Sequence, residues 1–296
     1  AALDETKLHN VFVFPPKSME EGQFWEALKA ELARTNKSGA LQWTNVVLCV
    51  HGFCNTFEFA AARLGKMVWD MGYPGVPLLY SWPASCNYPK SAEMATDEFE
   101  VATFTHFLEK LAVVAGQSGA RRLQLLAHSR GNELLLRAAY RLKEKNSPLK
   151  LDDLVLAAPD IHRHEFRDKY ADLLIERAKR ITLYVSEADW ALRLRTVFSR
   201  EPRLGRIRTG ETPFTKDGIQ TIDASGVSEF FGLNHDYHVR LEGITDLRAL
   251  LVDGLSASER AKKGLLKPSL QGPQEWFLLN RILTGSHDFL PSFYPN

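Results

Sequence analysis

Hydrophobic residues along the chain fall into short continuous runs, which alternate with longer stretches where they recur every third or fourth position. A short apolar run closed by Gly or Pro is typical of a buried β-strand, whereas the spaced pattern is typical of an amphipathic helix. The runs predict strands at residues 46–50, 76–82, 122–127, 154–158, 181–186 and 220–222, with one more short apolar run at 11–14.

Strands that alternate with helices indicate an α/β fold, with a mostly parallel central sheet and helices on both faces. The spaced pattern predicts these helices at residues 24–32, 57–71, 91–115, 131–142, 164–178 and 239–255. Because no repeat or linker interrupts the alternation, we expect residues 1–296 to form a single domain. Ligands of such sheets bind beyond the carboxyl ends of the strands, so functional residues should follow strands directly.

Two segments depart from this alternation. Residues 191–215 are rich in Arg, Gly and Pro and show little periodicity, so we expect a partial lid or a surface loop there. Residues 269–296 contain Trp276 and a Phe-rich end, so we expect this tail to pack against the domain.

Composition and charge narrow the range of partners. The formal net charge is +1, which does not indicate a nucleic-acid or membrane surface, and no apolar run approaches the ~20 residues of a membrane span. The three cysteines are Cys49, Cys54 and Cys86, an odd number that argues against a disulfide scaffold and favours a cytoplasmic location. Export with one bridge and one free thiol is also compatible with this number, and the start at Ala1 is compatible with processing. Nothing in the pattern predicts an oligomeric state.

The strongest chemical feature is Ser129, which stands between a predicted strand and a predicted helix. This strand–turn–helix context is that of a nucleophile elbow, a sharp turn that needs small residues two before and two after the serine. Here they are Ala127 and Gly131. A serine N-cap of an ordinary helix is the alternative interpretation. In an elbow, the backbone amide of Arg130 would face a developing oxyanion.

A second feature is His51-Gly52-Phe53, directly after the strand predicted at 46–50. Hydrolases with a nucleophile elbow carry their other oxyanion donor after an early strand. Gly52 has no side chain, so it would let the backbone approach a substrate closely. The amide of Phe53 is the candidate donor. An ordinary turn is the alternative, and His51 is expected to orient substrate rather than to act as a base.

A serine nucleophile needs a base, and the base needs an acid that orients it. In this fold the chain order is serine, acid, histidine. His235 lies in a loop after the last predicted strand and is the favoured base, with His238 as a rival. Asp189 and Asp160 both follow strands, and Asp189 is favoured as the acid because it follows the later strand.

Aromatic residues near strand ends are candidates for an apolar substrate pocket, Trp82 and Trp190 among them, although core positions would suit them equally. No set of His, Cys, Asp or Glu shows the spacing of metal ligands, so no metal is expected.

Six segments together resemble a mainly bacterial branch of the α/β-hydrolases. They are Val-His-Gly-Phe-Cys-Asn (50–55), Tyr-Ser-Trp-Pro-Ala (80–84), Ala-His-Ser-Arg-Gly-Asn (127–132), Ala-Ala-Pro-Asp-Ile (157–161), Leu-Tyr-Val-Ser-Glu-Ala-Asp (183–189) and Asn-His-Asp-Tyr (234–237). The resemblance implies a triad of Ser129, Asp189 and His235 and no cofactor. The chain departs from it at Arg130, where Met is usual. That charge would either favour an anionic substrate or pair with a neighbouring acid.

We therefore expect a serine hydrolase that cleaves a small-molecule ester or a related acyl compound. Acyl transfer on the same triad and a non-catalytic binding protein with the same fold are the alternatives. The identity of the acyl group is left open.

Overall fold

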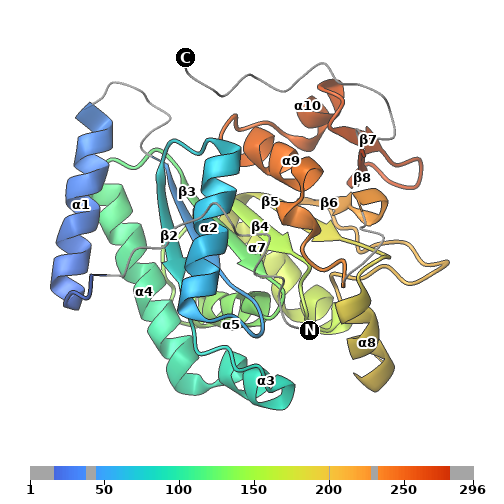
Figure 1. The fold of residues 1–296 in the computed structure, drawn as a ribbon, viewed down its shortest axis with the longest axis horizontal. Helices are drawn as coiled ribbons and strands as arrows, with labels where there is room; N and C mark the ends of the chain where they lie inside the picture. Colours follow the sequence, from blue (N-terminus) through green and yellow to red (C-terminus); the bar gives the residue numbers. More distant parts are fainter. Residues whose placement is uncertain (1–16, 38–44, 200, 228–232, 281–296) are drawn as a thin grey trace.

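A single eight-stranded sheet organises the part of the chain that the computed structural model describes, namely residues 17–37, 45–199, 201–227 and 233–280 (Figure 1). The strand order is β2-β1-β3-β4-β5-β6-β8-β7, and every neighbouring pair is parallel except β7 and β8. The strands are β1 (Val46–Val50), β2 (Val76–Tyr80), β3 (Leu123–His128), β4 (Leu151–Ala157), β5 (Ala178–Val185), β6 (Ile219–Asp223), β7 (Leu266–Pro268) and β8 (Glu275–Leu278). The predicted α/β class with a mostly parallel sheet is confirmed.

Helices cover both faces of this sheet. They are α1 (Glu21–Lys37), α2 (Phe57–Met71), α3 (Tyr88–Thr96), α4 (Glu98–Gln117), α5 (Gly131–Glu144), α6 (Arg163–Glu165), α7 (Ala171–Arg177), α8 (Trp190–Ser199), α9 (Leu241–Leu251) and α10 (Ala257–Lys262). A π-helical turn, η3 (Phe166–Tyr170), joins α6 to α7, and the 3₁₀ turns η4 (Ser225–Val227) and η5 (Tyr237–Val239) precede α9. None of these described helices has the length and apolar character that a bilayer crossing requires.

The alternation of side chains along each strand divides the core into two layers. In β1, Val46, Leu48 and Val50 join the cluster under α1, α4, α5 and α7, while Val47 and Cys49 join the cluster under α2, α9 and α10. Successive strand residues point to opposite faces, so a continuous apolar run is what a doubly covered sheet needs.

Two predicted helices are interrupted in the structure. The helix predicted at 91–115 is wrong as one element, because α3 ends and α4 begins around Asp97, whose carboxylate accepts the amides of Phe99 and Glu100 at the N-terminus of α4. The helix predicted at 164–178 is replaced by α6, η3 and α7, and Ala178 already belongs to β5.

The segment 191–215, expected to be a lid or a surface loop, begins inside a helix, α8. The residues after it run back along the sheet: the amides of Leu204 and Gly205 donate to the carbonyls of Ile161 and Pro159. Leu204, Ile207 and Phe214 are buried in the core. In the tail, β8 pairs with β6, whereas residues 281–296 and the apolar run at 11–14 lie outside the described residues.

Candidate active site

Ser129 occupies a sharp turn between β3 and α5, with a positive φ of 53°. Few non-glycine residues adopt this backbone region, and such residues cluster at functional sites. The turn requires close packing, because a Cβ added at Gly131 would lie 2.4 Å from the carbonyl oxygen of His51. Ala127, the departure from the commoner glycine, is fully buried at the end of β3. The strand, the turn and the helix therefore hold the serine at the carboxyl edge of the sheet.

His235 and Asp189 reach Ser129 from two later loops. The hydroxyl of Ser129 lies 2.7 Å from Nε2 of His235, and Nδ1 of His235 lies 2.7 Å from a carboxylate oxygen of Asp189. In the tautomer that this geometry favours, Nδ1–H donates to Asp189 and Nε2 accepts the serine proton. Such a chain of contacts can deprotonate a serine hydroxyl.

The loops that carry these two residues are joined to each other. The amide of Trp190, next to Asp189, donates to the carbonyl of Leu233 at 2.9 Å. The second carboxylate oxygen of Asp189 accepts the amide of Leu192 in α8. Asp189 is completely buried, so its carboxylate has little freedom to leave the imidazole.

The environment of His235 favours the charged imidazole. Burial lowers its pKa, but the charge of Asp189 and the hydrogen bond to Asp189 outweigh burial, so the pKa of His235 is raised above its ordinary value. An imidazole with a raised pKa is a stronger proton acceptor.

The backbone at Gly52 packs closely against Ser129. A Cβ added at Gly52 would lie 2.8 Å from Cβ of Ser129, so the loop approaches the serine as only a glycine allows. Among the described residues, the amides of Phe53 and Arg130 donate to no acceptor. These are the two amides that the sequence predicts as oxyanion donors.

The rival residues have other partners. Asp160 accepts the hydroxyl of Tyr88 at 2.6 Å and a guanidinium N–H of Arg130 at 2.8 Å, and Arg203 lies 3.4 Å away. The side chain of Arg130 thus pairs with acids, Glu133 included, rather than facing the serine. His238 is buried with its ring 4.5 Å from that of His128, whereas Nε2 of His235 is the ring nitrogen in contact with the hydroxyl of Ser129.

The candidate substrate-binding residues differ in what they touch. The indole N–H of Trp82 donates to the carbonyl of His51 at 2.7 Å, and the two rings stack. The imidazole of His51 lies 3.1 Å from the hydroxyl of Ser81, so this pair braces the loop. Trp190 is about half exposed, and the guanidinium of Arg193 lies over its ring.

A hollow of about 540 Å³ lies beside the loop that carries Phe53. It is lined by Asn55, Phe57, Ser81, Trp82, Pro83, Ala84, Ser85, Lys90 and Met94. Of the candidate substrate-binding residues His51, Trp82 and Trp190, Trp82 lines this hollow.

His128 also belongs to the candidate site, although the sequence patterns did not predict it. Its Nε2–H donates to the carbonyl of His235 at 3.2 Å, and Asp236, next to that carbonyl, is held by Arg63 of α2 at 2.7 Å. Burial, the first cause, lowers the pKa of His128 well below its ordinary value, so the ring is neutral. The available signal was its position: it is the last residue of β3, directly before Ser129.

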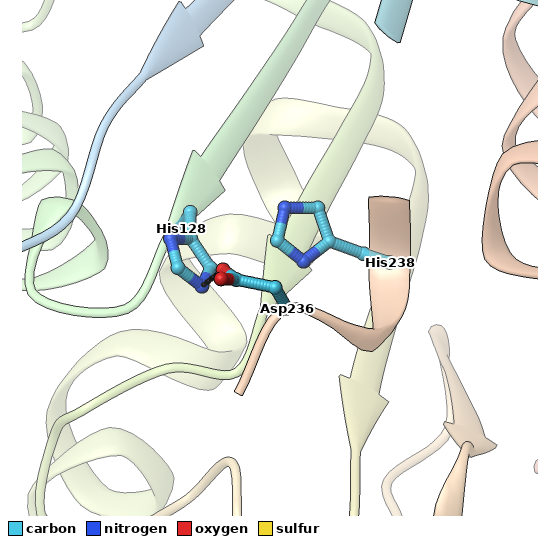
Figure 2. A group of neighbouring side chains, drawn as sticks. All are labelled: His128, Asp236 and His238. Carbon is cyan, nitrogen blue, oxygen red and sulfur yellow. Dashed lines mark ion pairs between the residues drawn. The ribbon is translucent and has the colours of Figure 1, made fainter. Parts of the chain in front are cut away.

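One group among the described residues has the chemistry of a metal site. His128, Asp236 and His238 offer ligand atoms within 4.8 Å of one another, and Figure 2 shows the three side chains converging from β3 and the segment before α9. Arg63 already pairs with Asp236, however, and Nε2 of His128 is engaged with His235. These contacts occupy one carboxylate oxygen of Asp236 and Nε2 of His128, so neither of these two atoms is free to bind a metal.

The cysteines form one crosslink. Cys54 and Cys86 are bridged, and Cys49 is free and buried in β1, where burial raises the pKa of its thiol to about 12. Three cysteines are compatible either with three free thiols or with one bridge and one free thiol, and the chain has the second arrangement.

A family model matches most of the chain. The model of a family described as alpha/beta hydrolase of unknown function (DUF900) matches residues 26–253. Among solved structures, an iodinated complex of acetyl xylan esterase is 10% identical with a TM-score of 0.37, covering 71% of this chain and 97% of that one. A Trichoderma reesei cutinase in complex with a phosphonate inhibitor is 12% identical with a TM-score of 0.33, covering 80% and 92%. A comparison with curated proteins found no match.

Proposed function

The chain belongs to the alpha/beta hydrolases of unknown function, and we propose that it is a serine hydrolase that cleaves carboxylic esters or related acyl bonds. The observation that carries this proposal is the unbroken chain of contacts from Ser129 to His235 to Asp189, both of 2.7 Å. It is supported by the elbow geometry of Ser129 and by the backbone amides of Phe53 and Arg130, which have no acceptor among the residues that the structure describes.

In the proposed mechanism, the hydroxyl oxygen of Ser129 attacks the acyl carbonyl while Nε2 of His235 takes its proton. Asp189 holds the imidazole in the required tautomer and stabilises the imidazolium. The amides of Phe53 and Arg130 would stabilise the oxyanion of the tetrahedral intermediate. The imidazolium then gives its proton to the leaving alkoxide, which departs as the alcohol and leaves an acyl-enzyme. Water, deprotonated by His235, attacks that ester, and collapse of the second intermediate releases the acid and restores Ser129.

The first prediction concerns the nucleophile itself. Ser129→Ala should lose turnover of a short-chain chromogenic ester by at least ~10³-fold, because only catalysis by the remaining groups survives. Far-ultraviolet circular dichroism should match that of the parent, since the new methyl fits where the hydroxymethyl group was. A fluorophosphonate should label the parent at Ser129, which mass spectrometry of the peptide would locate.

The matched control is Ser85→Ala, a serine near the hollow with no role in the proposed triad. It should keep its labelling by the fluorophosphonate. Equal ester turnover by the parent and Ser129→Ala would overturn the proposed function, and so would a folded parent that the probe leaves unlabelled.

A further inference from the structure

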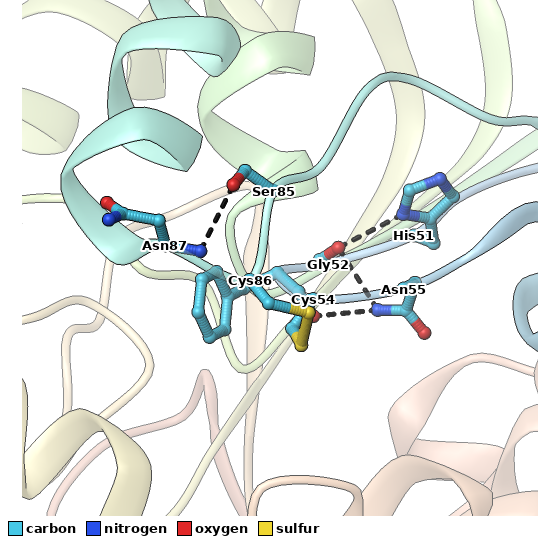
Figure 3. The surroundings of a disulfide bond; sticks show 8 residues. His51, Gly52, Cys54, Asn55, Ser85, Cys86 and Asn87 are labelled. Carbon is cyan, nitrogen blue, oxygen red and sulfur yellow. Dashed lines mark hydrogen bonds between the residues drawn. A yellow bond between two sulfur atoms is a disulfide. The ribbon is translucent and has the colours of Figure 1, made fainter.

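The disulfide between Cys54 and Cys86 joins two segments that flank Ser129. Cys54 directly follows Phe53, the candidate oxyanion donor, and Cys86 directly precedes Asn87, whose side chain caps the N-terminus of α3. The two Cα atoms are 4.1 Å apart, although the residues are separated by 32 positions. Figure 3 shows the bridge next to Gly52 and Asn55 on one side and next to Ser85 and Asn87 on the other. The bridge therefore ties the loop after β1 to the start of α3.

Hydrogen bonds also hold the loop after β1. At the upstream end, the carbonyl of His51 accepts the indole N–H of Trp82. At the downstream end, the side-chain amide of Asn55 donates to the carbonyls of Gly52 and Phe53 at 3.1 and 2.9 Å. Cys54 has a positive φ of 55°, a backbone region that a non-glycine residue keeps only where its surroundings hold it. The disulfide is the covalent element that holds this residue.

The segment that receives the bridge is fixed by the contacts of Tyr88. Two residues after Cys86, the ring of Tyr88 lies 5.5 Å from that of Phe53 and between the guanidinium groups of Arg130 and Arg195. The hydroxyl of Tyr88 donates to the buried Asp160. The bridge therefore ties Cys54, the neighbour of Phe53, to a segment that the hydrogen bond of Tyr88 anchors.

We infer that the Cys54–Cys86 disulfide positions the amide of Phe53 for oxyanion binding, so that opening the bridge lowers turnover while the triad stays intact. The inference rests on the proposed function, because it assigns the bridge a role in the same oxyanion hole. Cys86 is exposed and Cys54 is partly exposed, so a dissolved thiol can reach the bond. The two cysteines act as positioning residues and touch no reacting atom.

The opening step is thiol–disulfide exchange with a small dithiol. A thiolate of the dithiol attacks Sγ of Cys86, forms a mixed disulfide and releases the thiolate of Cys54. The second thiol of the reagent then releases Cys86 and becomes part of a cyclic disulfide. The protein gains two electrons and two protons, and the dithiol loses both.

The test compares the oxidised protein with the same protein after dithiothreitol, using one ester and its thionoester analogue. Alkylation and mass spectrometry should count two newly labelled cysteines, Cys54 and Cys86. We expect kcat on the ester to fall about tenfold and KM to change by less than about twofold. This loss is smaller than the ~10²–10³-fold loss in kcat that follows removal of one oxyanion-hole donor. The thionoester should lose less, because sulfur accepts hydrogen bonds weakly. Reoxidation should restore kcat.

The variant Cys54→Ala/Cys86→Ala is the matched control. It should reproduce the reduced state and should not respond to dithiothreitol, and Cys49→Ala should respond as the parent does. Should the double variant fail to fold, chemical reduction of the folded parent still decides the question. Unchanged kcat with two alkylated cysteines would overturn the inference alone, as would equal losses on both substrates. Absence of Ser129-dependent turnover in the oxidised parent would instead overturn the proposed function, and this inference with it.

Discussion

At the scale of single residues, the position of an acid decides whether it can serve His235. Asp160 and Asp189 both follow strands and both precede the histidine in the chain, and neither sequence context excludes the other. In the structure, Asp189 lies 2.7 Å from the imidazole, whereas Asp160 pairs with Tyr88 and Arg130. What separates them is the direction of each loop after its strand, and this direction depends on tertiary contacts.

The pH dependence of turnover should report this pairing. Neutral His235 is the form that accepts a proton, and its pKa is raised, so activity should fall as the pH drops through a value above the ordinary ~6.5. Asp189→Asn removes the charge that outweighs burial, so the inflection should move to lower pH, and kcat should fall by about 10⁴-fold. The measurement is kcat/KM against pH for the parent, and the rate of fluorophosphonate labelling against pH for the variant.

Asp160→Asn provides the comparison for this experiment, because it is the same chemical change at the rival acid. It should move the inflection much less, since the charge of Asp160 raises the pKa of His235 less than that of Asp189 does. A larger shift in Asp160→Asn than in Asp189→Asn would reassign the acid.

At the scale of elements, the elbow depends on how closely α5 approaches β1. Gly131→Ala would place a methyl 2.4 Å from the carbonyl oxygen of His51 and 2.9 Å from that of Val50. Both oxygens belong to the backbone, so neither can rotate away as a side chain would. We expect a loss of about 1–3 kcal/mol in the free energy of unfolding, as for other overpacked sites, together with a large loss of turnover. Urea unfolding and ester hydrolysis would measure the two effects.

Gly65→Ala is the counterpart inside another helix, α2, where nothing lies within 4 Å of the added Cβ. It should stabilise the protein by about 0.5–1 kcal/mol, because Ala has the higher helix propensity. If Gly131→Ala proved as benign as Gly65→Ala, the close approach at the elbow would not matter.

The elements also show where sequence patterns succeed and where they fail. The strand β1 was predicted to the residue and β3 to within one residue, because fully buried strands are continuous apolar runs. The start of β4 was missed by three residues, because Asp152 and Asp153 interrupt its apolar run. The break at Asp97 was missed because Asp is compatible with a helix, and its capping role depends on the direction of the preceding chain. The short β8 was missed because its pairing with β6 is a long-range contact that leaves no periodic signal. His128 was missed for a related reason: its partner is the carbonyl of a residue 107 positions away.

At the scale of the whole molecule, the residues after the matched family region complete the fold. The family model ends at residue 253, yet α10, β7 and β8 follow, and β8 extends the sheet beside β6. This extension is anchored by Arg260 of α10, which is fully buried and pairs with the equally buried Asp246 of α9. Asp246 also accepts the hydroxyl of Tyr184 in β5 at 2.5 Å. This buried ion pair thus links α10 to α9, in addition to the pairing of β8 with β6.

Removing one partner of this pair should be costly. Arg260→Met leaves the carboxylate of Asp246 buried without its cation, and we expect a loss of about 3–5 kcal/mol in the free energy of unfolding. Lys66→Met, which removes one partner of the partly exposed pair between Lys66 and Asp70, should cost less than about 1 kcal/mol. Chemical denaturation of both variants would measure the difference. Similar losses in the two would show that the extension does not depend on Arg260.

The state of the cysteines has a consequence for how the folded molecule meets reactive compounds. All three lie in the described part of the chain: two are consumed in the bridge, and the third is buried in β1 with a thiol whose pKa is raised to about 12. The oxidised protein therefore presents no thiolate to solvent, and soft electrophiles such as alkyl halides find no cysteine to modify. Under the proposed function, the hydroxyl of Ser129 is an oxygen nucleophile, which reacts with hard acyl and phosphorus centres. The oxidised molecule should therefore react with hard electrophiles but not with soft ones. Reduction of the disulfide would make it reactive towards both classes.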